Sequence, residues 1–273
     1  MRKVIDGFTF FTEIELLEIR LNILYPYVDH FILVEASRTH SNKLKPFYFE
    51  ENKEKFEKFL DKIIHIKVDF PENLGSHTWA LENYQRECIK DGLSKIDGLQ
   101  PNDILFISDL DEIPRPEIIT SLRNDEREKF IGALKTNIYY FFLNLKFQEA
   151  QGCYYNFLYV PRFCTLSKIP EFNQSLQKIR VLPPEQCDII LENAGWHWSF
   201  LSDAKGIQEK IEAFAHQEHN NPKNTSLTNI KEKMKNGSDI FGRSFGWEKC
   251  EIDKTYPTYI LENLEKFRKY IKL

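Results

Sequence analysis

Three carboxylate side chains follow one apolar segment in the stretch DILFISDLDEIPRP, residues 103–116. Asp109 and Asp111 are two positions apart, so an extended chain places both on one side, and Glu112 follows directly. Carboxylates brought together without a basic partner repel one another unless a cation neutralises them. Hard divalent ions such as Mg²⁺ and Mn²⁺ prefer oxygen ligands and can bridge to phosphate. The stretch therefore predicts a divalent-metal site, although the same acids could simply cap a turn or the helix expected near Pro116.

The segments before these acids predict where the site lies. Residues 103–109 are predicted to form a strand, because the apolar run at 104–107 directly before the acid cluster is typical of a central strand in a parallel sheet. Strand-like and helix-like stretches alternate before it, at 3–11, 12–28, 30–36, 62–70 and 78–93. This order favours an α/β fold with a doubly wound, mostly parallel sheet flanked by helices. Ligands of such sheets bind beyond the carboxyl ends of the strands, at a topological switch point.

The pattern changes after residue 128. Shorter strand-like stretches joined by short links predict antiparallel pairing, and a helical C-terminal region follows them. The strand-like stretches are residues 128–134, 137–147, 153–166 and 195–200, and the helical ones are 203–220, 226–237 and 259–273. We expect one domain, 1–273, in which residues 1–128 bind a nucleotide and residues 129–273 complete the acceptor and metal sites.

Composition narrows the class of protein. The net charge of −4 is mixed along the chain, which does not favour a nucleic-acid partner. Five cysteines without a C-x-x-C pair argue against a disulfide framework or a structural zinc site and favour a reducing compartment. The sequence shows neither a signal-peptide pattern nor the ~20 apolar residues of a membrane span. We expect a soluble, cytoplasmic protein, while its oligomeric state is not predicted.

Several stretches together resemble glycosyltransferase family 17. They occur in the family's order at residues 8–39, 45–49, 78–93, 103–116 and 195–200, and the last contains GWHWSF. The best-known members add bisecting N-acetylglucosamine to N-glycans. The resemblance implies a GT-A-like fold, a divalent ion (Mn²⁺ or Mg²⁺), a donor such as UDP-GlcNAc and inversion at the anomeric carbon. The many Lys, Ile and Asn residues are typical of a bacterial or viral member, so the saccharide acceptor need not be an N-glycan.

The resemblance assigns roles to individual residues. Asp109 and Asp111 match the family's metal motif, and Asp111 is the expected direct ligand. His197 in GWH matches a later metal position, although a histidine between two tryptophans could equally pack in the core. Glu35 and Ser37, at another strand end, could bind the ribose or uracil of the donor, and the alternative for Glu35 is an ion pair at the sheet edge.

Two arginines lie on the predicted helices near these strand ends. Arg86 could pair with the donor diphosphate or with the acid cluster, because its planar guanidinium suits both. Its alternative is a surface salt bridge with Glu82, four residues earlier. Arg20 could be no more than the partner of an acid on its own helix.

An inverting transfer also needs a catalytic base for the acceptor hydroxyl. The candidates are Glu149, Glu171, Glu192, Asp203 and Glu218. We favour Glu218 because it lies beside His216 and His219 and next to the loop-like stretch 219–226. Trp198 and Trp247 are the tryptophans we expect on the sugar-binding side.

Two other functions could use similar acids. A sugar-nucleotide hydrolase or nucleotidyltransferase could also bind a metal, but a nucleotidyltransferase usually has a glycine-rich loop with a basic residue after its first strand. The corresponding stretch, VIDGFTFFTE, has one glycine and no basic residue. A non-catalytic protein that binds glycans or nucleotides is the third possibility, and the intact acid cluster argues against it.

Overall fold

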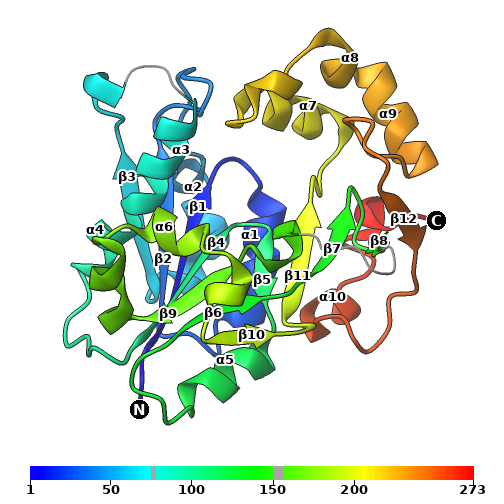
Figure 1. Ribbon diagram of the computed structural model, residues 1–273. Helices are drawn as coiled ribbons and strands as arrows, with labels where there is room; N and C mark the ends of the chain where they lie inside the picture. The colour runs from blue at the N-terminus through cyan, green and yellow to red at the C-terminus, as the bar shows by residue number, and fades with distance from the viewer. Residues whose placement is uncertain (75–77, 150–155) are drawn as a thin grey trace.

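The computed structural model describes residues 1–74, 78–149 and 156–273, which form two β-sheets flanked by helices (Figure 1). The larger sheet has seven strands in the order β10-β6-β9-β4-β1-β2-β3. Its strands are β1 Val4–Phe10, β2 His30–Ala36, β3 Ile63–Val68, β4 Ile104–Asp109, β6 Ile131–Leu134, β9 Arg162–Thr165 and β10 Ile189–Leu191. Residues 153–155 of the predicted stretch 153–166 lie outside the described residues.

The strand order of this sheet creates a switch point. β1, β2 and β3 are parallel neighbours, whereas β4 pairs in parallel with the other side of β1. β9 runs antiparallel between β4 and β6, and β6 pairs in parallel with β10. The predicted α/β architecture, a mostly parallel sheet with an antiparallel extension, is therefore confirmed. The chain order reverses between β1 and β4, where a ligand is expected.

The core packs against both faces of the larger sheet, which explains the uninterrupted apolar run of β4. Ile104 and Phe106 join the cluster that includes Leu17 of helix α1. Leu105 and Ile107, on the opposite face, join the cluster that includes Ile89 of α4. Because successive side chains of a strand point to opposite faces, each of these residues is buried.

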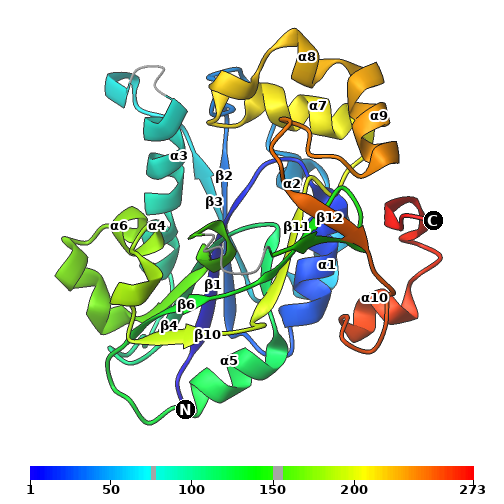
Figure 2. The ribbon, with the colours of Figure 1, turned by 45° about the vertical axis from the view of Figure 1, so that its right-hand side comes forward.

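Helices cover both faces of the sheet, and a group of them lies beyond its carboxyl-end edge. Figures 1 and 2 show α7, α8 and α9 grouped above the strand ends, opposite α3. The helices are α1 Ile14–Leu24, α2 Tyr48–Glu51, α3 Thr78–Glu87, α4 Ile89–Leu93, α5 Pro116–Arg123, α6 Leu176–Arg180, α7 Ala204–Ala213, α8 Pro222–Thr225, α9 Leu227–Asn236 and α10 Thr258–Glu262. Within residues 1–74, 78–149 and 156–273, none of the helices has the length and apolarity needed to cross a membrane.

The second sheet joins the acid cluster to the GWH segment. It has five strands in the order β12-β8-β7-β11-β5. They are β5 Glu112–Pro114, β7 Asn137–Tyr140, β8 Leu145–Gln148, β11 Gly195–Ser199 and β12 Gly246–Lys249. β5 starts at the last acid of the cluster and pairs antiparallel with β11, with His197 opposite Glu112 and Gly195 opposite Pro114. Two segments far apart in the sequence are thereby held in one register.

This register depends on the glycine of GWH, so Gly195→Ala is expected to destabilise the protein. A Cβ at position 195 would lie 2.3 Å from the Ile113 carbonyl oxygen, a backbone atom that cannot rotate away. Overpacking of this kind costs about 1–3 kcal/mol. Urea unfolding measures the change. Gly246→Ala is the matched control, because a Cβ there meets nothing closer than 3.4 Å. Equal midpoints for the two variants would contradict this account of the strand pairing.

Candidate active site

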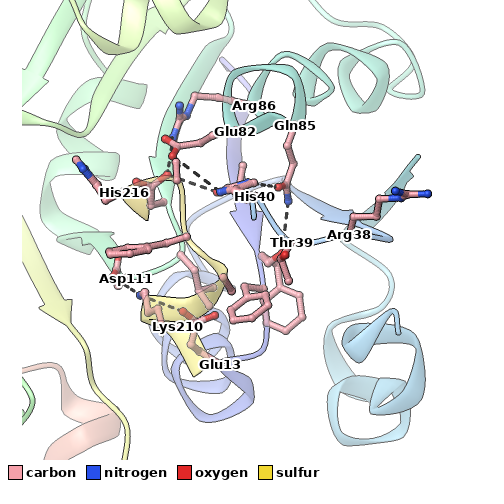
Figure 3. Close-up of a pocket in the computed structure, with 18 of the residues that line it drawn as sticks. Glu13, Arg38, Thr39, His40, Glu82, Gln85, Arg86, Asp111, Lys210 and His216 are labelled. Carbon is pink, nitrogen blue, oxygen red and sulfur yellow. Dashed lines mark hydrogen bonds and ion pairs between the residues drawn. The ribbon is translucent and has the colours of Figure 1, made fainter. Parts of the chain in front are cut away.

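A cleft lies at the carboxyl ends of β1, β2 and β4, at the switch point of the larger sheet. Its volume is about 260 Å³, just below the ~300–1,000 Å³ typical of small-molecule sites. Figure 3 shows side chains from α3 and from Lys210 on α7 converging on it. Among its lining residues are Thr9, Phe10, Glu13, Arg38, Thr39, His40, Lys45, Trp79, Glu82, Gln85, Arg86, Asp109, Asp111, His197, Lys210 and His216. The cleft therefore combines charges of both signs with apolar walls, to which Phe11, Leu110 and Phe214 also contribute.

Asp109, the last residue of β4, is held by two buried arginines. Its Oδ1 accepts a hydrogen bond from Arg86 Nη2 at 2.9 Å, and its Oδ2 accepts one from Arg180 Nη2 at 3.0 Å. Burial alone would raise the pKa of the Asp109 carboxyl, but the ion pairs with Arg180 and Arg86 hold this pKa well below its usual range. The premise that the acids lack a basic partner was wrong, because the partners come from α3 and α6, whereas the pairing of Arg86 with the acid cluster that we considered is confirmed.

Glu112 is a structural member of the cluster rather than a lining residue of the cleft. Its side chain is buried, and both of its oxygens bind the Arg180 guanidinium at 2.7 Å. Glu112 Oε2 also accepts the backbone N–H of Asp109 at 2.9 Å. Glu112 therefore positions Arg180 and closes the turn between the two aspartates.

Asp111 faces a lysine and a histidine. Lys210 Nζ lies 3.1 Å from Asp111 Oδ2 and 3.0 Å from Glu13 Oε1, and Figure 3 marks these ion pairs with dashed lines. His197 Nε2 lies 3.6 Å from Asp111 Oδ1. Burial alone would raise the pKa of Asp111, whereas Lys210 and His197 lower it below the ordinary value. Asp111 is thus ionised at neutral pH, with His197 Nε2 as the neighbour of its Oδ1.

Arg20 holds the backbone of the turn that carries both aspartates. Its Nη1 donates to the carbonyl oxygens of Asp109, Leu110 and Glu112, at 3.0, 3.0 and 2.8 Å. Its Nε and Nη2 donate to the Asp6 carboxylate on β1 at 2.8 and 2.6 Å. Arg20 is completely buried, and the alternative that we considered for it, a pair with an acid of its own helix only, was wrong.

Asp111 and His197 are the residues whose geometry fits a divalent ion. Two neighbouring ligand atoms on an ion with ~2.1 Å bonds lie about 3 Å apart in octahedral geometry. The 3.6 Å between Asp111 Oδ1 and His197 Nε2 is close to this separation. Asp109 fits less well as a direct ligand, because both of its oxygens already bind guanidinium groups. A coordinating role for Asp111, His197 or Asp109 stays a prediction.

The ion pairs of Asp109 predict that low pH lowers the free energy of unfolding. The pKa of Asp109 is lower in the native chain than its unfolded value of about 3.9. At a pH between these two pKa values, the unfolded chain binds a proton that the native chain does not. This stability is present above pH 4 and is lost as the pH falls through the native pKa. Urea unfolding at pH 7, 5, 4 and 3 measures the slope of the free energy of unfolding against pH. Asp109→Asn is expected to make the slope shallower, and an unchanged slope would contradict the assignment.

The structure also locates the other predicted residues. Arg86 is buried and binds Asp109, Glu82 and Gln177, so it is more than a surface partner of Glu82. Glu35 is completely buried and binds Lys45 and His65, which matches the ion pair we considered for it. In the segment after β2, the lining residues of the cleft are Arg38, Thr39 and His40, directly after Ser37. Roles for Glu35 and Ser37 in donor binding stay predictions.

Glu218 and the two tryptophans lie away from the centre of the cleft. Glu218 is more than half exposed, and its carboxylate binds His216 Nδ1 at 2.6 Å. Trp198 is completely buried and stacks on Trp196, with ring centroids 5.8 Å apart. The prediction that Trp198 lies on the sugar-binding side was wrong, because its ring is buried and leaves no face for a ligand. Trp247 stacks on Tyr140 with centroids 4.5 Å apart and stays a weaker candidate.

Sequence reasoning missed Arg180, Lys210, Glu13 and His40. The segment LQKIR that carries Arg180 has no sequence pattern that would point to a functional site. Lys210 does show such a pattern, because it lies three residues after Ile207 and one before Ile211, which are two of the buried positions of α7. A lysine beside the apolar face of a helix is placed to reach a neighbouring element.

The sequence as a whole is similar to those of known proteins. The sequence model of glycosyltransferase family 17 matches residues 1–271. A rat beta-1,4-mannosyl-glycoprotein 4-beta-N-acetylglucosaminyltransferase is 25% identical over 292 aligned residues, which cover 98% of this chain and 54% of the rat protein. The human protein of the same name is 26% identical over 227 residues, with 77% and 43% covered. The chain spans about half the length of these curated relatives.

A solved structure, that of S. aureus TarS 1-349, superposes with a TM-score of 0.41 at 10% identity and covers 77% of this chain and 63% of that one. The family assignment therefore rests on the sequence match, which extends over both the acid cluster of β4–β5 and the GWH segment of β11. The chain belongs to glycosyltransferase family 17.

Proposed function

We propose that this protein is a metal-dependent inverting glycosyltransferase that moves N-acetylglucosamine from UDP-GlcNAc to a saccharide acceptor of a glycan or glycoconjugate. The observation that carries the proposal is the convergence of Asp111 and His197 in the lining of a cleft at the switch point of the sheet. The donor sugar is suggested by the relatives, which are named N-acetylglucosaminyltransferases.

Each group of side chains has a distinct part in this proposal. Asp111 and His197 would hold Mn²⁺ or Mg²⁺, and the ion would neutralise the diphosphate of the leaving nucleotide. Lys210 lies at the same carboxylate and would place a second positive charge near the phosphates. Asp109 would orient Arg86 and reach the donor ribose or the ion through water. The buried pairs around Asp109 keep these side chains at fixed positions, as an in-line transfer requires.

The catalytic base has no equally clear candidate. The carboxylates that line the cleft are each paired with a cation: Glu13 and Asp111 with Lys210, and Glu82 and Asp109 with Arg86. A paired carboxylate is a weaker base than a free one. Glu218 stays a prediction for this role.

The test is release of UDP from UDP-GlcNAc, UDP-GalNAc and UDP-Glc in Mn²⁺, with and without EDTA and with a panel of saccharide acceptors. We expect acceptor-dependent release that is greatest for UDP-GlcNAc and abolished by EDTA. Equal release without any acceptor would instead indicate a sugar-nucleotide hydrolase. Full turnover in EDTA would exclude the metal dependence, and a preference for GDP- or CMP-sugars would exclude the donor assignment.

A further inference from the structure

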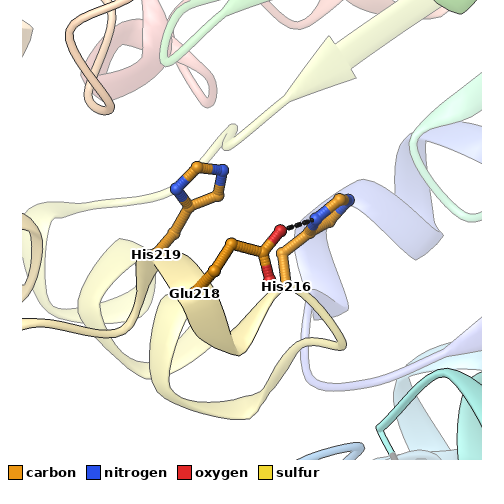
Figure 4. Close-up of side chains that lie close together, drawn as sticks. All are labelled: His216, Glu218 and His219. Atoms are coloured by element: carbon orange, nitrogen blue, oxygen red, sulfur yellow. Dashed lines mark hydrogen bonds and ion pairs between the residues drawn. The ribbon is translucent and has the colours of Figure 1, made fainter.

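A second group of metal-binding side chains lies on the turn that follows α7, where His216, Glu218 and His219 lie close together (Figure 4). One ligand atom from each of the three residues lies within 4.8 Å of the other two. We propose that this turn is a separate binding site for Zn²⁺ or a similar transition-metal ion. The proposal does not depend on the sugar-transfer activity.

The donor atoms of this group differ from those of the acid cluster. Two imidazoles and one carboxylate are a ligand set found in catalytic zinc sites, where water completes the coordination. Imidazole nitrogens suit Zn²⁺, Ni²⁺, Cu²⁺ and Co²⁺, whereas Mg²⁺ and Mn²⁺ prefer oxygen ligands. The turn is therefore expected to select a different ion from the one proposed for Asp111 and His197.

The turn already has much of the shape that chelation requires. Gln217–His219 is a short 3-10 helix, and the His219 N–H donates to the His216 carbonyl oxygen at 3.0 Å. The His219 carbonyl oxygen in turn accepts a hydrogen bond from Asn224 Nδ2 at 2.9 Å. These bonds hold the backbone between the two histidines, so an ion needs to order little besides the Glu218 side chain.

Both imidazole rings are also packed against aromatic side chains. The His219 ring stacks on Phe241, with centroids 4.1 Å apart and an interplanar angle of 16°. The His216 ring meets Trp79 edge-on, with centroids 4.5 Å apart. The Glu218 carboxylate supplies the negative charge and is 57% exposed, so an ion can reach it from solvent. The rings are therefore held in place while the ligand atoms stay accessible.

The location of the turn connects this site with the cleft. His216 and Trp79 both line the cleft, so an ion on the turn would lie at its margin. With three protein ligands, the ion would keep one position for water or for an oxygen of a bound molecule. Glu218 would then act as a metal ligand, which differs from the base role predicted for it from the sequence.

The test is metal binding by the whole chain in the absence of any sugar nucleotide. Zn²⁺ affinity is measured by competition with a chromophoric chelator, and Co²⁺ binding by its visible absorption. His219→Gln is expected to weaken Zn²⁺ binding at least about tenfold, because loss of even an outer partner of a metal site costs 10–100-fold. His30→Gln, on the first residue of β2, is the matched control and is expected to bind as the wild type does.

Asp111→Asn separates this site from the acid cluster. We expect that variant to keep the Zn²⁺ affinity of the wild type, because the turn is intact. Loss of Zn²⁺ binding in Asp111→Asn but not in His219→Gln would place the ion in the cleft and overturn the proposal. Equal affinity of the wild type and His219→Gln would also overturn it. Circular dichroism confirms that each variant is folded, and none of these outcomes depends on whether sugar is transferred.

Discussion

Asp111→Asn is expected to lower the rate of sugar transfer at least about 100-fold, because a bound divalent ion contributes several kcal/mol of charge stabilisation at the transition state. The substitution removes the charged ligand from the Asp111–His197 pair. The free energy of unfolding is expected to fall by no more than about 3 kcal/mol, the contribution of a hydrogen bond to a charged group, since Asp111 is buried. The Asn side chain can still accept a hydrogen bond from Lys210, and Lys210 keeps its ion pair with Glu13.

The measurement is UDP release under saturating donor together with urea unfolding of the same preparation. Asp97→Asn is the matched control, since Asp97 is exposed and precedes the start of β4, at the opposite edge of the sheet. It is expected to keep wild-type turnover. If Asp111→Asn unfolded at much lower urea while the folded fraction remained fully active, the acid cluster would be a structural feature and not a catalytic one.

Arg20→Met is expected to have the largest effect on stability, lowering the free energy of unfolding by about 3–5 kcal/mol, as is typical of breaking a buried ion pair. Methionine fills much of the volume but leaves the Asp6 carboxylate buried without its cation. The carbonyl oxygens of Asp109, Leu110 and Glu112 would also lose their common donor. Any folded fraction is therefore expected to bind donor poorly, because the turn that carries both aspartates would no longer be held.

Arg268→Met is the control for this variant, since Arg268 is largely exposed and forms an ion pair with Glu265, nearby in sequence. A change within about 0.5 kcal/mol is expected there. Urea unfolding and donor binding by calorimetry measure both variants. Wild-type stability of Arg20→Met would show that the buried network is not required for the fold.

The sequence already contained the signal for Arg20. It occupies the position between Leu17 and Leu21 on a stripe that continues to Leu24, at the i, i+3, i+4, i+7 spacing of a buried helix face. A single arginine on such a face must find a partner, because an unpaired buried charge is costly. Its partners could not be read in the same way, since Asp6 and the turn after β4 are brought to it only by the parallel pairing of β1 with β4.

Local patterns located the strands of the first half well, whereas the predicted strand 137–147 is two strands, β7 and β8, and the helices were located less well. β2 lies at the predicted residues 30–36, and β4 matches 103–109 to within one residue. The predicted helix 78–93 is two helices, α3 and α4, and the predicted helix 259–273 contains only α10 and a short 3-10 turn. Apolar strand runs are determined by burial on both faces, whereas helix ends depend on contacts made with other elements.

By itself, the sequence determined the α/β class, the place of the acids at the end of a central strand and the family to which the chain belongs. These features follow from short-range periodicity and from motifs that occupy contiguous residues. Only the tertiary structure decided that the acids are neutralised by Arg86, Arg180 and Lys210, which come from three different helices. The physical reason is that ion pairs depend on distance in space, and the pairing of β5 with β11 and the packing of α3, α6 and α7 set those distances.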